Sequence, residues 1–216
     1  MRHSIAIGMV ATLLSASAAR AGLVITEVMS GSDNDGNPAL DSDWWELTNT
    51  GPGDVDLTGW GWDDTATTTG PQAVFGNLIV PAGTRLLVIE AIDAAEEASW
   101  RAMWNIPTDV NVINESELAS GDFSGLGQGG DQVTLFNTAT VAMENATFGP
   151  ATPGVSFEWD ELNNSLGLSV IGENGAYAAP NDLIGIADIG SPGTPVPEPT
   201  SLALACVGGL LLWRRR

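Results

Sequence analysis

The sequence predicts an all-β sandwich or barrel with a single helix, and two observations lead to this. Residues that favour strands occur in short runs, which are broken by glycine, proline, asparagine and aspartate. Several of these runs alternate apolar and polar residues, as strands do when one face lies in a core. The predicted strands are Leu23–Val28, Asp43–Asn49, Val55–Trp60, Asn77–Val80, Thr84–Ile89, Gln132–Asn137, Thr140–Phe148 and Val155–Trp159.

The strand predicted at Asp43–Asn49 contains two adjacent tryptophans. Alternation places Trp45 and Leu47 on one face and Trp44 on the other. If Trp45 and Trp60 lie in the core, Trp44 is the exposed aromatic and could stack against a sugar ring. The alternative is burial, which is the more usual place for a large aromatic side chain.

One helix is predicted at Asp93–Trp104. Asp93 is a suitable N-cap, and Glu96 follows three residues later, which is the spacing of a capping box. Trp100, Met103 and Trp104 form an apolar stripe along the helix. We expect this stripe to pack against the sandwich and not to line a binding site.

The protein is strongly acidic. It has 27 acidic residues and seven basic residues, all of them arginine. Between residues 22 and 196 there are 26 acidic residues but only Arg85 and Arg101, so this part has a net charge of −24. Such a surface repels nucleic acid and anionic membranes, and it suits a hydrated, cation-rich exterior or simply high solubility.

The sequence lacks the residues that several kinds of catalytic and metal-binding site need. The one histidine is His3 and the one cysteine is Cys206, and both lie in the apolar end segments. The part between these segments therefore has no Ser-His-Asp or Cys-His site, no usual zinc ligands and no disulfide. Carboxylate chemistry and cations that prefer oxygen ligands remain.

Both ends of the chain have the character of targeting segments, so we expect three parts: a signal peptide at 1–21, a folded domain at 22–190 and a sorting segment at 191–216. Met1–Ala21 has a positive start, an apolar centre and a small-residue end, which is typical of a secretory signal peptide and implies passage through the secretion translocon. Near the other end, the apolar run Leu202–Trp213 would be a helix of about 18 Å against a hydrocarbon layer of about 30 Å. We therefore expect a short transmembrane helix that holds the protein stably or only transiently in the inner membrane, with the sandwich outside.

The last residues carry a recognisable order of features. The tripeptide Pro197-Glu198-Pro199 precedes the apolar run, and Arg214, Arg215 and Arg216 end the chain. This arrangement resembles the PEP-CTERM sorting signal. The resemblance implies that an exosortase recognises and cuts the tail, and that the protein reaches the cell surface or an exopolysaccharide matrix.

The predicted strands carry a second resemblance. Residues 25–28 (ITEV), 44–49 (WWELTN) and 55–60 (VDLTGW) are similar to the opening of a lamin tail domain, and later segments at 78–89 and 130–135 follow in the same order. The resemblance implies an immunoglobulin-like β-sandwich, without catalytic residues to carry over. The stretches 91–122 and 160–188 are longer than in that family, and we expect any function specific to this protein to lie there.

One loop has the composition of a cation site. Its oxygen-bearing residues are Asp33, Asp35, Asn37, Asp41 and Asp43. Ca²⁺ takes six to eight oxygen ligands, and closely spaced aspartates on a loop can supply them. The alternative is a solvated turn, because aspartate, asparagine and glycine favour turns for conformational reasons alone.

Together these observations predict an exported, non-catalytic surface or exopolysaccharide-matrix protein with a structural or adhesive role. The first alternative is a calcium-dependent polysaccharide-binding module that uses the acidic loop and Trp44. The second is a carboxylate-dependent glycoside hydrolase, which would need two carboxyl groups about 5–10 Å apart in a cleft. No motif in the sequence selects such a pair.

Overall fold

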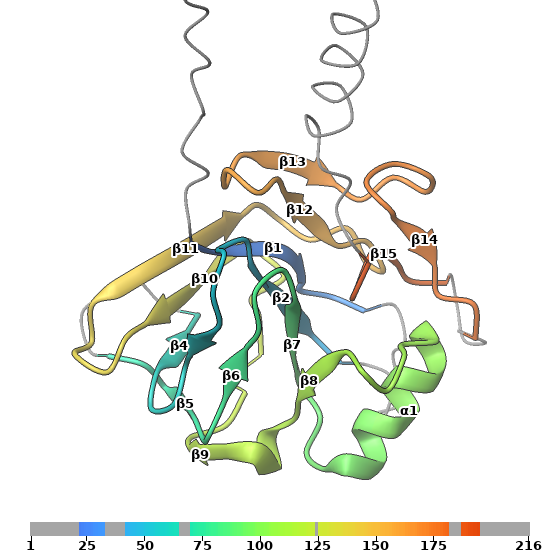
Figure 1. Cartoon of the computed structure of the whole chain (residues 1–216). Coiled ribbons are helices and arrows are strands. Elements are labelled where there is room, and N and C mark those ends of the chain that lie inside the picture. The colour runs from blue at the N-terminus through green and yellow to red at the C-terminus, as the bar shows by residue number, and fades with distance from the viewer. Residues whose placement is uncertain (1–21, 33–41, 65–69, 124, 182–186, 195–216) are drawn as a thin grey trace, which may run out of the picture.

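Two β-sheets pack face to face, and one helix lies against the outside of the larger sheet (Figure 1). The computed structural model describes residues 22–32, 42–64, 70–123, 125–181 and 187–194. The predicted signal peptide, most of the acidic loop and the sorting segment from residue 195 lie outside the described residues. A mostly β sandwich with one inserted helix is therefore confirmed, and it fits the immunoglobulin-like expectation.

The larger sheet has six strands in the order β13-β12-β1-β2-β7-β8. Its neighbours are antiparallel, except that β7 and β8 run parallel. Its strands are β1 (Leu23–Met29), β2 (Trp44–Asn49), β7 (Arg85–Ile89), β8 (Asn111–Ile113), β12 (Phe157–Trp159) and β13 (Ser165–Leu168).

The smaller sheet has five antiparallel strands in the order β11-β10-β4-β5-β9. Its strands are β4 (Gly61–Asp63), β5 (Ala73–Phe75), β9 (Leu118–Ser120), β10 (Asp131–Phe136) and β11 (Ala142–Phe148). The remaining elements are the pair β3 (Val55–Asp56) and β6 (Ile79–Val80), the pair β14 (Tyr177–Ala178) and β15 (Ile189–Gly190), helix α1 (Ala94–Trp104) and a short 3₁₀ helix, η1 (Glu115–Glu117).

The main core fills the space between the two sheets. Trp45 and Leu47 of β2 enter it from the larger sheet, and Val133 and Leu135 of β10 enter it from the smaller one. The indole of Trp45 packs edge-on against that of Trp62 in β4, with 5.5 Å between the ring centroids. The alternation predicted for β2 is therefore confirmed, and β10 alternates in the same way.

A second core lies on the outer face of the larger sheet, under helix α1. The helix begins at the predicted N-cap: Oδ1 of Asp93 accepts from the amide of Ala95 at 2.8 Å. The Glu96 side chain, expected to complete a capping box with Asp93, accepts instead from the amide of Ile92 at 2.9 Å. The predicted stripe of Trp100, Met103 and Trp104 is buried against this face of the sheet.

The prediction that Trp44 is the exposed aromatic is wrong. Its side chain is fully buried, and its ring packs edge-on against both Trp100 and Trp104, at centroid distances of 5.9 and 5.8 Å. Alternation placed Trp44 on the outer face correctly, but helix α1 covers that face.

Some strands differ from the prediction. The run expected as one strand at Val55–Trp60 is only β3 followed by a turn, in which the Trp60 amide donates to the Leu57 carbonyl at 2.9 Å and Gly59 has a positive φ of 74°. The unpredicted strands, such as β4, β5 and β8, have two to four residues each, which is too short for alternation to be visible. Within the described ranges, no helix has the length and apolar character needed to cross a membrane.

Candidate functional site

Three buried glutamates lie side by side across the larger sheet. Strand β1 has a bulge between Ile25 and Glu27, and it turns both Thr26 and Glu27 toward the outer face. Glu27 then stands opposite Glu46 of β2 on one side and Glu158 of β12 on the other. The three residues are at most 4% exposed. Such a row of like-charged groups is costly unless hydrogen bonds or protonation relieve it.

The carboxyl group of Glu27 holds the segment that leads to the C-terminal tail. Ser191 donates to it twice, from its amide at 2.7 Å and from its hydroxyl at 2.8 Å. The amide of Gly193 donates to Oε2 of Glu46 at 2.7 Å. Gly190 lies so close that an added Cβ would be 2.7 Å from Oε1 of Glu27. We call these contacts the exit clamp, because they fix the last described residues to the centre of the sheet.

A chain of short oxygen contacts links Glu27 to Glu158. Ser156 Oγ lies 2.6 Å from Oε1 of Glu27 and 2.6 Å from Ser169 Oγ, which lies 2.7 Å from Oε1 of Glu158. These three contacts need three protons, but the two serine hydroxyls supply only two. One carboxyl group of this chain must therefore carry a proton.

Among the residues that the structure describes, the row has one cationic partner. Arg85 lies 3.1 Å through Nε from Oε1 of Glu46, and both side chains are almost enclosed. The Thr26 hydroxyl donates to the same oxygen at 2.7 Å and also contacts the Thr48 hydroxyl at 2.9 Å. Glu46 is therefore the member of the row with the best support for a negative charge.

The pKa values agree with this proton count. Burial, and then the charge of Glu46, raises the pKa of Glu27 to about 8. Burial also raises the pKa of Glu46, although the Arg85 guanidinium opposes the shift. Tyr177 donates its hydroxyl to the Trp104 carbonyl at 3.0 Å. Burial, and then the charges of Glu27 and Glu46, raise the pKa of Tyr177 to about 12. We conclude that Glu27 holds the proton near neutral pH. Because the three side chains are buried and the described chain's own groups donate to them, we assign the row to holding the fold.

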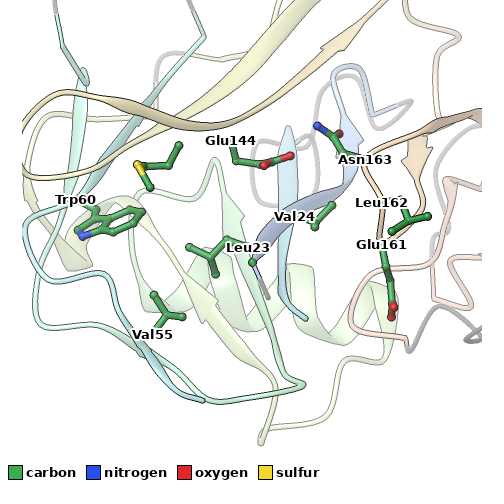
Figure 2. Close-up of a pocket in the computed structure, with 10 residues that line it drawn as sticks. Leu23, Val24, Val55, Trp60, Glu144, Glu161, Leu162 and Asn163 are labelled. Atoms are coloured by element: carbon green, nitrogen blue, oxygen red, sulfur yellow. The ribbon is translucent and has the colours of Figure 1, made fainter. Parts of the chain in front are cut away.

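An open cleft lies elsewhere, at the beginning of β1 (Figure 2). It has a volume of about 330 Å³. Its walls come from β1, strand β3 and the segment after it, strand β11 and the turn between β12 and β13. It is lined by Gly22, Leu23, Val24, Val55, Trp60, Met143, Glu144, Glu161, Leu162 and Asn163. The turn lies at the start of 160–188, one of the two stretches expected to carry a specific function.

The predicted cation site is only partly visible. Asp33, Asp35, Asn37 and Asp41 lie outside the described residues. Asp43 is partly buried, and its Oδ2 accepts from the Leu126 amide at 2.7 Å. In the part of the chain that the structure covers, no group of three or more acidic, histidine or cysteine residues is arranged to hold a metal ion. Binding of Ca²⁺ by the loop stays a prediction.

Comparison with known protein families identifies the family of this chain. The sequence model of the Lamin Tail Domain matches residues 16–149, more than half of the 216 residues. The chain belongs to the lamin tail domain family. The matched residues of this lamin tail domain begin within the predicted signal peptide and end just after β11. Strands β12 and β13 lie after the matched residues, and they complete the six-stranded sheet.

A second match covers the other end. Residues 195–216 match the PEP-CTERM protein-sorting motif, which includes Pro197, Glu198, Pro199 and the three terminal arginines. These residues lie outside the described part of the structure. No curated protein matches this lamin tail domain protein.

Sequence reasoning missed both the glutamate row and the cleft. Glu27 and Glu46 lie inside segments that resemble the family, and an acid between apolar residues of a strand is a signal for a buried, hydrogen-bonded carboxyl group. Trp60 was expected in the core, and it packs against that core while it also lines the cleft. No sequence pattern could show that four distant segments meet there.

Proposed function

We propose that this lamin tail domain protein is an exported, non-catalytic component of the cell surface or of an exopolysaccharide matrix, with a structural or adhesive role. An exosortase would recognise its tail after export through the secretion translocon. The observation that carries the proposal is the match of residues 195–216 to the PEP-CTERM protein-sorting motif. The motif begins directly after the exit clamp at Ser191 and Gly193.

The arrangement of the clamp supports a structural role. Glu27 and Glu46 belong to neighbouring central strands of the larger sheet, and each receives an amide of the exit segment. A pull on the tail would therefore act on the middle of the sheet and not on a peripheral strand. This is the expected construction of a domain that is held at its C-terminal end.

The chemistry of the domain supports a non-catalytic role. Residues 22–194 contain no histidine, cysteine or lysine. The three glutamates of the row are enclosed within the fold, so this row is not the open pair that a glycoside hydrolase needs. The calcium-dependent alternative loses Trp44 as its stacking residue, because that side chain is buried.

The sorting step can be tested in a bacterium that has an exosortase and in the same strain without it. We expect the wild-type chain to lose its terminal residues and to appear outside the inner membrane only in the first strain. The double variant Pro197→Ala/Glu198→Ala should keep its tail and stay with the membrane fraction. Intact-mass measurement of the purified chain and cell fractionation give the two results.

The matched control is Pro195→Ala, which changes a proline of the same spacer outside the tripeptide. It should be processed like the wild type. Equal processing with and without the exosortase, or a double variant that is cut normally, would contradict the proposal.

A further inference from the structure

The larger sheet ends at β13, which lies at the margin of the molecule (Figure 1). Among the described residues, β12 is the one strand that pairs with β13. Leu168 stands opposite Phe157, whose ring packs on Phe148 of the main core with 5.4 Å between the ring centroids. Leu166 and Leu168 themselves belong to neither core. Strand β13 therefore carries the sheet beyond the part that the core covers.

Large apolar side chains are exposed along this end of the sheet. Nine such side chains are exposed among the described residues, and five of them lie within ten consecutive residues. These five are Leu162, Leu166, Leu168, Val170 and Ile171, which we call the apolar margin. Single apolar residues on a surface are usual, but a group of them is typical of an interaction site.

The apolar margin also differs from the other borders of the two sheets in charge. Residues 162–172 contain no charged side chain. By contrast, the border strand β11 contains Glu144, and the border strands β8 and β9 flank the acidic helix η1 (Glu115–Glu117). Charged residues at a border strand prevent contact between sheets of different molecules, and β13 has no such protection.

The charge of the domain narrows the kind of partner. Residues 22–196 have a net charge of −24, so two copies repel each other wherever their acidic surfaces meet. They can approach each other at the apolar margin, where the chain carries no charge. The rest of the domain repels an anionic membrane, and a basic partner would be drawn to the acidic surfaces instead. A twofold pair needs one patch that matches itself, and an uncharged apolar patch does so.

We propose that the apolar margin joins two copies of this protein, with Leu166 and Leu168 of one copy packed against the same residues of the other. A continuous added strand does not suit β13, because its pairing with β12 shifts register between Glu158 and Trp159, and Gly167 has a positive φ of 92°. Side-chain contacts therefore hold the pair. The inference goes beyond the proposed function and does not rest on the sorting of the tail; it gives the domain a way to join its own copies.

The contact should be weak, because β13 has only four residues and stable interfaces bury roughly 1,200–2,000 Å². We expect a dissociation constant on the order of 100 µM. Sedimentation velocity of the purified full-length chain in a nonionic detergent, over a range of chain concentrations, measures this constant. Association should become stronger between about 0.02 M and about 0.5 M salt, because salt screens the repulsion between two acidic copies. Weaker association at high salt would overturn the inference, since it would indicate contacts between charged groups.

Substitutions separate the apolar margin from general repulsion. Leu166→Glu places a charge in the margin of each copy and should weaken dimerisation at least about tenfold. Ile92→Glu is the matched control, since Ile92 is exposed outside the margin and also gains one charge in each copy. It should weaken dimerisation about twofold at most, because salt screens a charge that lies away from the contact. Equal effects of the two substitutions would overturn the inference, and so would undiminished association of Leu166→Glu, which would place the contact elsewhere, such as in the tail.

Hydrogen exchange locates the contact without any substitution. Peptides that cover residues 162–171 should exchange more slowly at high chain concentration than at low concentration, whereas peptides from β9 should not change. Protection that does not depend on chain concentration would overturn the inference, because a segment of the same chain or the detergent would then cover the margin. This measurement still decides if Leu166→Glu does not fold. Because the purified chain needs no exosortase, failure here leaves the sorting proposal untouched.

Discussion

The buried carboxyl group of Glu27 should make the stability of this domain fall as the pH rises. Its pKa lies at about 8 in the folded protein, against an ordinary value of 4.5. Between these values the folded chain holds a proton that the unfolded chain has released. The contribution to stability is therefore complete below about pH 4.5 and is lost progressively up to about pH 8.

The size of the effect follows from the width of that window. Each pH unit within it changes the free energy of unfolding by about 1.4 kcal/mol, so the whole window gives at most about 5 kcal/mol. The substitution Glu27→Gln keeps the shape and the acceptor oxygen but cannot release a proton. We expect it to flatten the pH profile and to make the domain at least as stable as the wild type near pH 8.

Urea unfolding followed by tryptophan fluorescence, at several pH values between about pH 5 and about pH 8, measures this difference. Glu173→Gln, an exposed change of the same kind, should run parallel to the wild type. The lowered pKa of Asp56, caused by hydrogen bonds from Thr58, acts only at lower pH and does not enter the window. A wild-type profile that is flat or rises with pH, or a Glu27→Gln profile that runs parallel to it, would refute the assignment of the proton to Glu27.

Three further changes test other parts of the fold. Arg85→Leu removes the cation next to buried Glu46, so it should lower the free energy of unfolding by about 3–5 kcal/mol near neutral pH and by less in acid. An equal decrease at both pH values would contradict the ion pair. Trp104→Ala should lower the free energy of unfolding in urea by about 3–5 kcal/mol, because the ring packs on Trp44 beneath the helix. A decrease below about 1 kcal/mol would mean that the helix does not pack tightly on that face of the sheet. Asp93→Ala should lower the free energy of unfolding by about 1 kcal/mol, because the helix loses its cap. Asp109→Ala, at an exposed position, should leave the free energy of unfolding almost unchanged. Equal effects of the two substitutions would argue against capping by Asp93.

Much of the fold could be predicted because it depends on local features of the chain. The alternation around Trp45 and the cap at Asp93 are short-range patterns, and both are confirmed. The sorting motif is a linear signal, so its order alone identifies it. The absence of histidine and cysteine between the two end segments also needs no structure.

Other features depend on what lies next to each residue in space. Trp44 was predicted to be exposed because alternation shows on which face of a strand a side chain lies, but not which other element covers that face. Helix α1, about 50 residues later in the chain, covers the face that carries Trp44. The very short strands escaped prediction because their pairing partners, and not their own sequences, define them.

The sequence by itself determined the alternation of the long strands, the helix, the acidic surface and the sorting tail, since each is a property of neighbouring residues. Only the tertiary structure decided the rest. A single bulge at Thr26 turns Glu27 toward Glu46, and the meeting of β1, β11 and the turn before β13 forms the cleft beside Trp60. Burial, proton sharing and cavity shape arise from contacts between segments far apart in the chain, and no local pattern records those contacts.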